Sequence, residues 1–225
     1  MKKLRVAVLI SGRGSNMKAL IDAAASPEFP AEIILVISNI RDAAGLAVAR
    51  SAEIPTRTIE HRAFGKGEAG RLAFEAALSS ALKEANAELI CLAGFMRLLS
   101  PAFVRDWDKR LINIHPSLLP SFRGLDVHRA MLAAGVKIAG CTVHFVSADL
   151  DAGPIIGQAA VPVLADDTPE SLAGRILVEE HRLYPECVRR IAVGDIRFAP
   201  NGTVAVSGAP TAGALLNPAP VTRPL

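Results

Sequence analysis

Three polar side chains in the second half of the chain have the types and the spacing to carry out acyl-transfer chemistry. Asn113 and His115 follow the apolar residues Leu111 and Ile112, and Asp151 lies in a loop after another apolar run. Residues two apart on a strand point to the same side, so Asn113 and His115 can face one pocket that Asp151 reaches from its loop. An amide can donate to an oxyanion, an imidazole can transfer protons and a carboxylate can tune the imidazole. These side chains therefore predict an acyl-transfer site.

A second candidate site is the segment 11–16, Ser-Gly-Arg-Gly-Ser-Asn, which lies between a strand pattern and a helical pattern. Glycines let backbone N–H groups approach an anion, and a helix N-terminus adds partial positive charge. The segment lacks the ending of a Walker loop and the third glycine of the dinucleotide-binding fingerprint. Two interpretations stay open: a tight turn with Ser15 as helix cap, or a monophosphate cradle formed by Gly14, Ser15 and Asn16.

Strand and helix patterns alternate through the first half of the chain and must position these sites. Apolar, β-branched runs predict buried strands at 4–10, 32–38, 56–59, 89–93 and 111–114. Helical spacing or helix-start signals predict helices at 15–25, 43–52, 68–86 and 101–107. This alternation predicts an α/β fold, in which a Rossmann-like, mostly parallel, twisted sheet carries helices on both faces.

The pattern changes after residue 114. We expect a helix at 126–134, strands at 138–146 and 154–163, a long helix that Thr168-Pro169 opens, and two short strands around the turn 199–202. The two longer strands are joined by the Asp151 loop and are expected to form an antiparallel C-terminal extension. Residues 1–207 are thus predicted to form a single domain. The segment 208–225 contains four prolines, two glycines and one charge, and is predicted to be a disordered tail.

Composition limits the classes of protein to consider. The chain has 225 residues, of which 51% are hydrophobic, enough for one α/β domain with a real core. The formal net charge is only +3, and scattered Lys and Arg residues argue against nucleic acid as a ligand. The three cysteines are far apart in the sequence and form no CxxC pair. The N-terminus shows no export signal, and no apolar run reaches the ~20 residues that span a membrane. We therefore expect a cytoplasmic protein that acts on small molecules without membrane contact, and the sequence leaves open whether it is a monomer or a homodimer.

The remaining histidines lack the spacing of a metal site, and no metal is predicted. His61 is expected at the surface, and His128, His144 and His181 are expected to be structural.

Several segments, in order along the chain, resemble the folate-dependent glycinamide ribonucleotide formyltransferases of purine biosynthesis. The matching segments are 8–16, 92–101, 112–120 with the Asp151 loop, and Glu179-Glu180-His181 before Tyr184-Pro185. The signature Asn-x-His-Pro-Ser-x-Leu-Pro at 113–120 is shared by transferases and hydrolases that use 10-formyltetrahydrofolate. The first loop combined with Glu180 points to the ribonucleotide substrate. The resemblance covers roughly residues 4–195 and implies the formyltransferase fold.

The resemblance also implies a reaction. The amine of 5′-phosphoribosylglycinamide attacks the formyl carbon of 10-formyltetrahydrofolate, which gives formylglycinamide ribonucleotide and tetrahydrofolate. Asn113 would donate to the developing oxyanion, and losing such a donor costs roughly 10²–10³ in rate. His115 would stabilise the same charge and supply protons. Asp151 would favour the imidazolium or fix a proton-carrying water. The resemblance also implies that His144 supports the active site without contacting the substrates. No metal is required, because the folate nitrogen already activates the formyl group.

Binding roles follow from the same resemblance. The ribonucleotide is expected to contact Gly14, Ser15 and Asn16 through its phosphate, Glu180 through its ribose hydroxyls, and Pro116. The folate cosubstrate is expected to contact Arg71, Met96, Arg97, Leu98, Leu99, Asn113, Val146 and Asp151. Aligning Arg71 with the family requires extra residues around 65–67, so Lys66 is an alternative.

Other functions stay open at this point. A 10-formyltetrahydrofolate hydrolase would share Asn113, His115 and Asp151 but use water, and usually carries an extra N-terminal regulatory domain. A methionyl-tRNA formyltransferase would need a C-terminal RNA-binding domain. A folate- or nucleotide-binding module would bind ligand without turnover.

Overall fold

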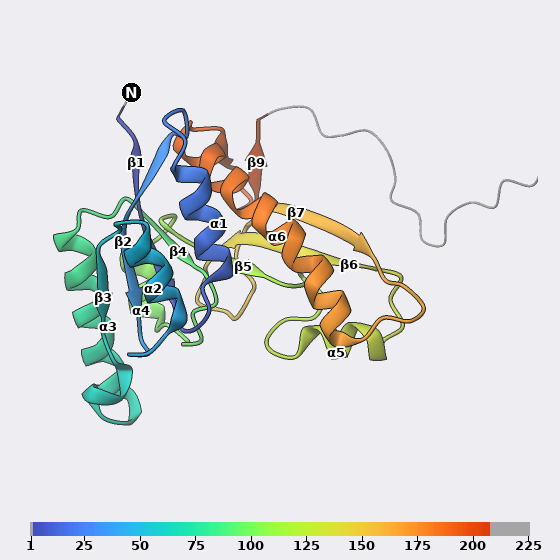
Figure 1. Cartoon of the computed structure of the whole chain (residues 1–225), viewed down its shortest axis with the longest axis horizontal. Helices are drawn as coiled ribbons and strands as arrows, with labels where there is room; N and C mark the ends of the chain where they lie inside the picture. Colours follow the sequence, from blue (N-terminus) through green and yellow to red (C-terminus); the bar gives the residue numbers. More distant parts are fainter. Residues whose placement is uncertain (1, 208–225) are drawn as a thin grey trace, which may run out of the picture.

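A seven-stranded sheet forms the centre of the computed structural model, which describes residues 2–207 (Figure 1). Its strands lie in the order β3-β2-β1-β4-β5-β6-β7. They are β1 (Leu4–Ile10), β2 (Ala31–Ser38), β3 (Thr56–Thr58), β4 (Leu89–Leu92), β5 (Leu111–His115), β6 (Ile138–Phe145) and β7 (Ile155–Pro162). The strands β3, β2, β1, β4 and β5 pair in parallel with their neighbours. Strand β6 pairs antiparallel with both β5 and β7. The predicted mostly parallel sheet with an antiparallel extension is confirmed.

Helices cover both faces of this sheet. They are α1 (Ser15–Ala24), α2 (Ala44–Ser51), the 3-10 helix η1 (His61–Phe64), α3 (Gly67–Glu84), α4 (Pro101–Asp106), α5 (Val127–Ala133) and α6 (Pro169–Ala192). A small hairpin of β8 (Ile196–Phe198) and β9 (Val204–Val206) follows α6, as the turn at 199–202 predicts.

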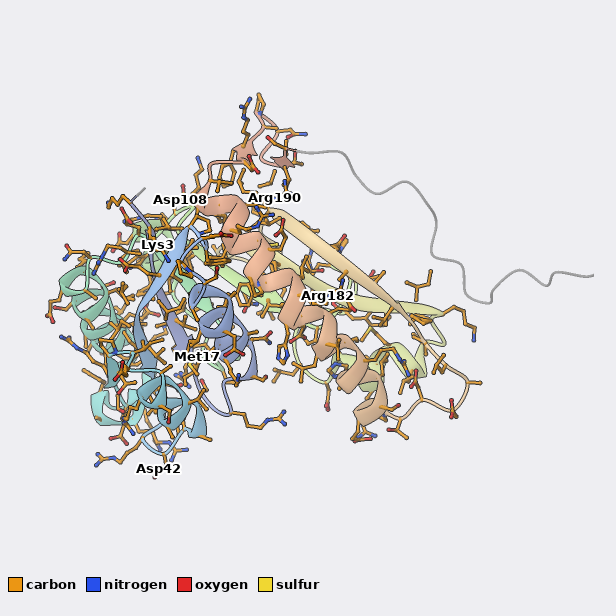
Figure 2. All side chains as sticks on the ribbon, turned by 45° about the horizontal axis from the view of Figure 1, so that its top comes forward. Lys3, Met17, Asp42, Asp108, Arg182 and Arg190 are labelled. Atoms are coloured by element: carbon orange, nitrogen blue, oxygen red, sulfur yellow. The ribbon has the colours of Figure 1, made fainter. Side chains whose placement is uncertain are left out.

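Strand β1 shows why the central strands are apolar throughout. Val6 and Val8 belong to a core shared with α1, α2 and α6, whereas Ala7 and Leu9 belong to a core shared with α3 and α4. Successive side chains on a strand point to opposite faces, so a strand covered on both sides must be apolar at every position. Met17 of α1, labelled in Figure 2, is fully buried in the first of these cores.

Helix α6 runs beside α1 and along β6 and β7 (Figure 1). Its start is capped by Thr168, whose side chain accepts from the Ser171 N–H, with Pro169 in the first turn. Tyr184 is fully buried, and its hydroxyl lies 3.0 Å from the Leu92 carbonyl oxygen and 3.3 Å from that of Ile112. These bonds fix α6 over β4 and β5, and therefore fix Glu180 one turn earlier. Arg182 and Arg190 project from the same helix in Figure 2 and pair with Glu179 and Glu186.

The start of α1 differs from one expectation. Its N-cap is Gly14, in the left-handed region with φ 72°, and within the described residues no side chain caps it. The interpretation of Ser15 as a side-chain cap is therefore wrong, since Ser15 is already the first helical residue.

Two further predictions concern the C-terminal segment and the absence of a membrane span. The predicted tail at 208–225 lies outside the described residues, so its disorder and the single-domain boundary at 207 stay predictions. Within residues 2–207, none of the helices combines the length and hydropathy that crossing a bilayer requires.

Candidate active site

The predicted site residues gather at the carboxyl edge of the parallel strands. Segment 11–16 follows β1, Met96 follows β4, and Asn113 and His115 lie on β5. Parallel strands end at one edge of a sheet, and loops from neighbouring strands meet there. The antiparallel strand β6 enters from the opposite direction and adds its own side chains beside those of β5.

Asn113 is held by His144, the histidine that the family resemblance connects with support of the active site. Asn113 and His144 are directly opposite in the β5–β6 register, and Asn113 Nδ2 lies 3.3 Å from His144 Nε2. His144 Nδ1 lies 2.9 Å from the Phe145 carbonyl oxygen, which can only accept, so Nδ1 carries a proton. Burial lowers the pKa of His144 and favours the neutral ring, whose Nε2 then accepts from Asn113. The amide of Asn113 keeps a second N–H that is not used in this bond.

His115 is buried, with 5% of its surface exposed, and each of its ring nitrogens lies close to a polar group of another residue. Its Nε2 donates to the Phe122 carbonyl oxygen at 2.9 Å, and its Nδ1 lies 3.5 Å from Asp151 Oδ2. Because the carbonyl fixes a proton on Nε2, Nδ1 is the nitrogen that can gain or lose one beside the carboxylate.

Asp151 lies between the two histidines. Its side chain is 10% exposed, with Oδ1 3.9 Å from His144 Nε2 and Oδ2 accepting from the Gly124 N–H at 2.9 Å. Its backbone has φ 47°, an uncommon conformation for a non-glycine residue. Gly153 allows the loop to turn back against β6, because a Cβ there would overlap the Phe145 carbonyl oxygen. Asn113, His115 and Asp151 are therefore brought together, as predicted.

The loop between β1 and α1 is closely packed against α2. A Cβ at Gly14 would lie 3.1 Å from Gly45 Cα, and the Gly45 N–H donates to the Gly12 carbonyl oxygen at 3.0 Å. The first N–H groups of a helix have no helical acceptor, so those after Gly14 are available to an anion.

Asn16 and Glu180, 164 positions apart, form a hydrogen bond of 2.6 Å from Nδ2 to Oε2. Glu180 is 6% exposed, and burial raises the pKa of its carboxyl, while the bond from Asn16 and the charge of His115 lower it. Asn16 Oδ1 is buried without a hydrogen-bond partner among residues 2–207. The phosphate-loop and ribose-site candidates are therefore adjacent, and Glu180 lies within electrostatic reach of His115.

The predicted folate-slot residues follow β4 and β6, the two strands that flank β5. The side chains of Met96 and Leu98 are 66% and 69% exposed, whereas Leu99 packs against the core of α3 and α4. Val146 is half-buried, and its N–H donates to the Leu111 carbonyl oxygen at 2.9 Å. Exposed apolar side chains beside a polar centre suit a flat, partly apolar ligand.

The structure leaves both candidates for the basic residue in place. Arg71 is half-buried, and its Nε is shielded without a hydrogen-bond partner in the described part of the chain. Lys66 is exposed at the N-cap of α3. Arg97 is exposed, and Pro116 is half-buried directly after His115. Binding roles for these residues stay predictions.

Sequence reasoning missed the backbone partners of the site. No sequence pattern singled out the Phe122 carbonyl or the Gly124 N–H, because backbone groups look alike in every sequence. For His144, the resemblance indicated a supporting role, and the β5–β6 pairing adds that its partner is Asn113, directly opposite. Among residues 2–207, no group of three His, Cys, Asp or Glu side chains is arranged to hold a metal ion.

Comparison with known proteins gives a consistent result. Residues 4–188 match the family described as formyl transferase. The chain is 50% identical over 203 residues to the trifunctional purine biosynthetic protein adenosine-3 of Bos taurus, covering 90% of this chain but 20% of that protein. It therefore spans about a fifth of the length of this relative. It is 42% identical to the phosphoribosylglycinamide formyltransferase of Escherichia coli (strain K12), over 88% of this chain and 92% of that one.

Solved structures show the same fold. A phosphoribosylglycinamide formyltransferase from Anaplasma phagocytophilum has a TM-score of 0.85 and 50% identity, over 93% of this chain and 97% of that chain. A formyltetrahydrofolate deformylase from Pseudomonas syringae has a TM-score of 0.82 but 27% identity, and this chain covers 66% of it.

Proposed function

This chain belongs to the formyl transferase family, and we propose that it transfers the formyl group of 10-formyltetrahydrofolate to the amine of 5′-phosphoribosylglycinamide. The products are formylglycinamide ribonucleotide and tetrahydrofolate, and the reaction is a step of de novo purine biosynthesis. The observation that carries the proposal is the joining of two clusters at one edge of the sheet. Asn113, His115 and Asp151 form one cluster, and the bonded pair Asn16 and Glu180 forms the other.

Asn113, His115 and Asp151 can each take a separate role in formyl transfer. Attack of the amine nitrogen on the formyl carbon places negative charge on the formyl oxygen, and the second N–H of Asn113 can donate to it. His144 supports this role by holding the amide with its nitrogen toward the reaction centre. The amine must lose a proton and the folate nitrogen must gain one as its bond to the formyl carbon breaks. His115 Nδ1 and Asp151, directly or through a water, can carry that proton.

The binding groups suit the two substrates. The N–H groups after Gly14 fit a phosphate, with Ser15 and Asn16 at its side, and the buried carboxylate of Glu180 can accept from ribose hydroxyls. Pro116 directly follows His115, which supports assigning it to the ribonucleotide. Met96, Arg97, Leu98, Leu99 and Val146 line the folate slot, and Arg71 or Lys66 supplies its positive charge. A cytoplasmic location, action without a metal, and a monomeric or homodimeric state complete the proposal.

The test follows absorbance as tetrahydrofolate is released from 10-formyltetrahydrofolate, with and without 5′-phosphoribosylglycinamide. Release that depends on the ribonucleotide supports the transferase. Release without it would support the hydrolase alternative, which has a more distant structural neighbour in the deformylase. Binding of both compounds without turnover would contradict both enzymatic functions.

A further inference from the structure

A chain of hydrogen bonds joins Met96, in the expected folate slot, to three other loops at the same edge of the sheet. The Met96 N–H donates to Ser11 Oγ at 2.8 Å, and the Ser11 hydroxyl donates to Asn39 Oδ1 at 2.6 Å. Asn39 Nδ2 lies 3.1 Å from His61 Nδ1. These four residues follow strands β4, β1, β2 and β3, so one chain of bonds connects four consecutive parallel strands.

The first two bonds in this chain have a defined direction. A serine hydroxyl has one proton, and since Ser11 accepts from Met96 it donates that proton to Asn39. The amide of Asn39 therefore turns its nitrogen toward His61, whose Nδ1 lies 3.1 Å from that nitrogen and 3.3 Å from the Asn39 carbonyl oxygen. Asn39 is 3% exposed, so water cannot easily replace a lost partner.

Ser11 holds the first part of the folate-slot segment at two points. Its backbone N–H donates to the Gly94 carbonyl oxygen at 3.1 Å, and its side chain accepts from Met96. The far end of the segment is held separately, because the Ser100 N–H donates to Glu75 Oε1 at 2.7 Å. The Met96 side chain is exposed, so apolar burial contributes little to its position. The bond to Ser11 is therefore the contact that fixes the Met96 peptide.

We propose that Ser11, Asn39 and His61 are positioning residues that hold the Met96 peptide in the shape that binds the folate cosubstrate. None of the three contacts Asn113, His115 or Asp151 through a hydrogen bond or an ion pair in the described structure. A slot that is ordered before binding avoids the entropy cost of ordering it with ligand. The inference rests on the proposed function, because it assumes that a folate occupies this slot.

The test measures the Kd of tetrahydrofolate and, separately, of 5′-phosphoribosylglycinamide by titration calorimetry on the full chain. Ser11→Ala removes the acceptor of Met96 but keeps the backbone bond to Gly94. Losing one such bond is expected to raise the Kd of tetrahydrofolate about fivefold. The Kd of the ribonucleotide should change by less than about twofold, because the loop backbone that faces the phosphate is retained. Ser11→Thr keeps a hydroxyl and should restore folate binding.

The matched control is Ser79→Ala. It removes a hydroxyl that accepts from Trp107 Nε1 at 3.1 Å. Ser79 lies in the second half of α3, toward the edge of the sheet where the parallel strands begin. It should lower thermal stability and leave both Kd values within about twofold of wild type. His61→Phe breaks the far end of the chain of bonds. Its effect on folate binding should be smaller than that of Ser11→Ala and non-additive with it. At saturating folate, kcat of Ser11→Ala should stay near wild type while KM for folate rises.

The outcomes separate the inference from the proposed function. If wild type binds tetrahydrofolate and Ser11→Ala binds it equally well, the positioning role is wrong and the function stands. An equal loss for both ligands, or the same loss in Ser79→Ala, would show general destabilisation and also overturn the inference. If wild type binds no tetrahydrofolate, the proposed function fails and the inference fails with it.

Discussion

The two edges of the large sheet both carry clustered charged and polar groups, but these groups are buried at the carboxyl edge and exposed at the amino edge. At the carboxyl edge, His115, His144 and Asp151 are at most 10% exposed and contact one another. At the amino edge, the side chains of Lys2 and Glu88 are 77% and 38% exposed. They line an open cavity of about 420 Å³, completed by Arg5, Lys83, Asn86, Ala87, Trp107 and Arg110.

Most charges of the amino edge find partners within it. Lys2 Nζ lies 2.7 Å from Glu88, and Arg5 pairs with Glu32 at 3.1 Å. Arg110 covers the Trp107 ring at 4.6 Å and donates to the Asp106 carbonyl oxygen. At the carboxyl edge, by contrast, Asn113 keeps a second N–H and Asn16 Oδ1 is buried without a partner in the described chain. Unused hydrogen-bonding capacity at Asn113 and Asn16, rather than charge or cavity size, therefore distinguishes the carboxyl edge from the amino edge.

The strongest test of this comparison removes one central group at a time. Asn113→Ala, His115→Ala and Asp151→Ala should each keep the fold and lower kcat by roughly 10²–10³, because each removes a charge-stabilising or proton-transferring group. Arg110→Ala, at the amino edge, should leave kcat unchanged. The measurement is kcat with both substrates saturating, with the melting temperature as a check on folding. Near-normal kcat in any of the three variants would remove that residue from its role.

Glu180→Gln should separate function from stability at the carboxyl edge. KM for the ribonucleotide should rise about tenfold, because a charged acceptor is lost. Burial raises the pKa of Glu180, so the stability linked to its protonated form is present at low pH and lost as pH rises through the raised value. A neutral glutamine should therefore raise the melting temperature near pH 8 but not near pH 4. An unchanged KM, or a lower melting temperature at pH 8, would contradict this.

Glu88→Gln makes the corresponding change at the amino edge. The hydrogen bond from Lys2 lowers the pKa of Glu88, followed by the bond from the Arg5 N–H, so its contribution to stability is present above the ordinary pKa and lost as pH falls. Since the pair is exposed, the free energy of unfolding should drop by less than about 1 kcal/mol at pH 7. Urea unfolding at low and high salt would measure this drop and its screening. A measurable loss of kcat would show that the amino edge takes part in the reaction.

The smallest effect is expected from shortening the chain after Ser207. The segment 208–225 lacks a core-forming pattern, so activity and melting temperature should stay at their full-length values. Comparing the two chain lengths in one assay measures this. A large drop in melting temperature would show that the segment packs against one of the two edges.

Much of the fold could be predicted because the patterns that specify it are local. Strand β1 was placed at 4–10 by an unbroken apolar run, and the start of α6 by the neighbours Thr168 and Pro169. Asn113 and His115 were placed on one side of a strand by their spacing alone. Gly14 was the exception within a local pattern. Gly14, in the left-handed region that glycine adopts without strain, is the N-cap, so Ser15 is already helical, and a Cβ at Gly14 would lie 3.1 Å from Gly45 Cα.

The sequence by itself thus determined the strands, the α-helices and the identity of the three central polar groups, since each depends on residues within a few positions, whereas the 3-10 helix η1 was not predicted. Tertiary structure alone decided what those groups touch. The β5–β6 register sets His144 against Asn113, the chain turn at 122–124 brings backbone groups to His115 and Asp151, and α1–α6 packing joins Asn16 to Glu180. Such contacts depend on strand register and helix packing over as many as 164 positions, which no local periodicity encodes.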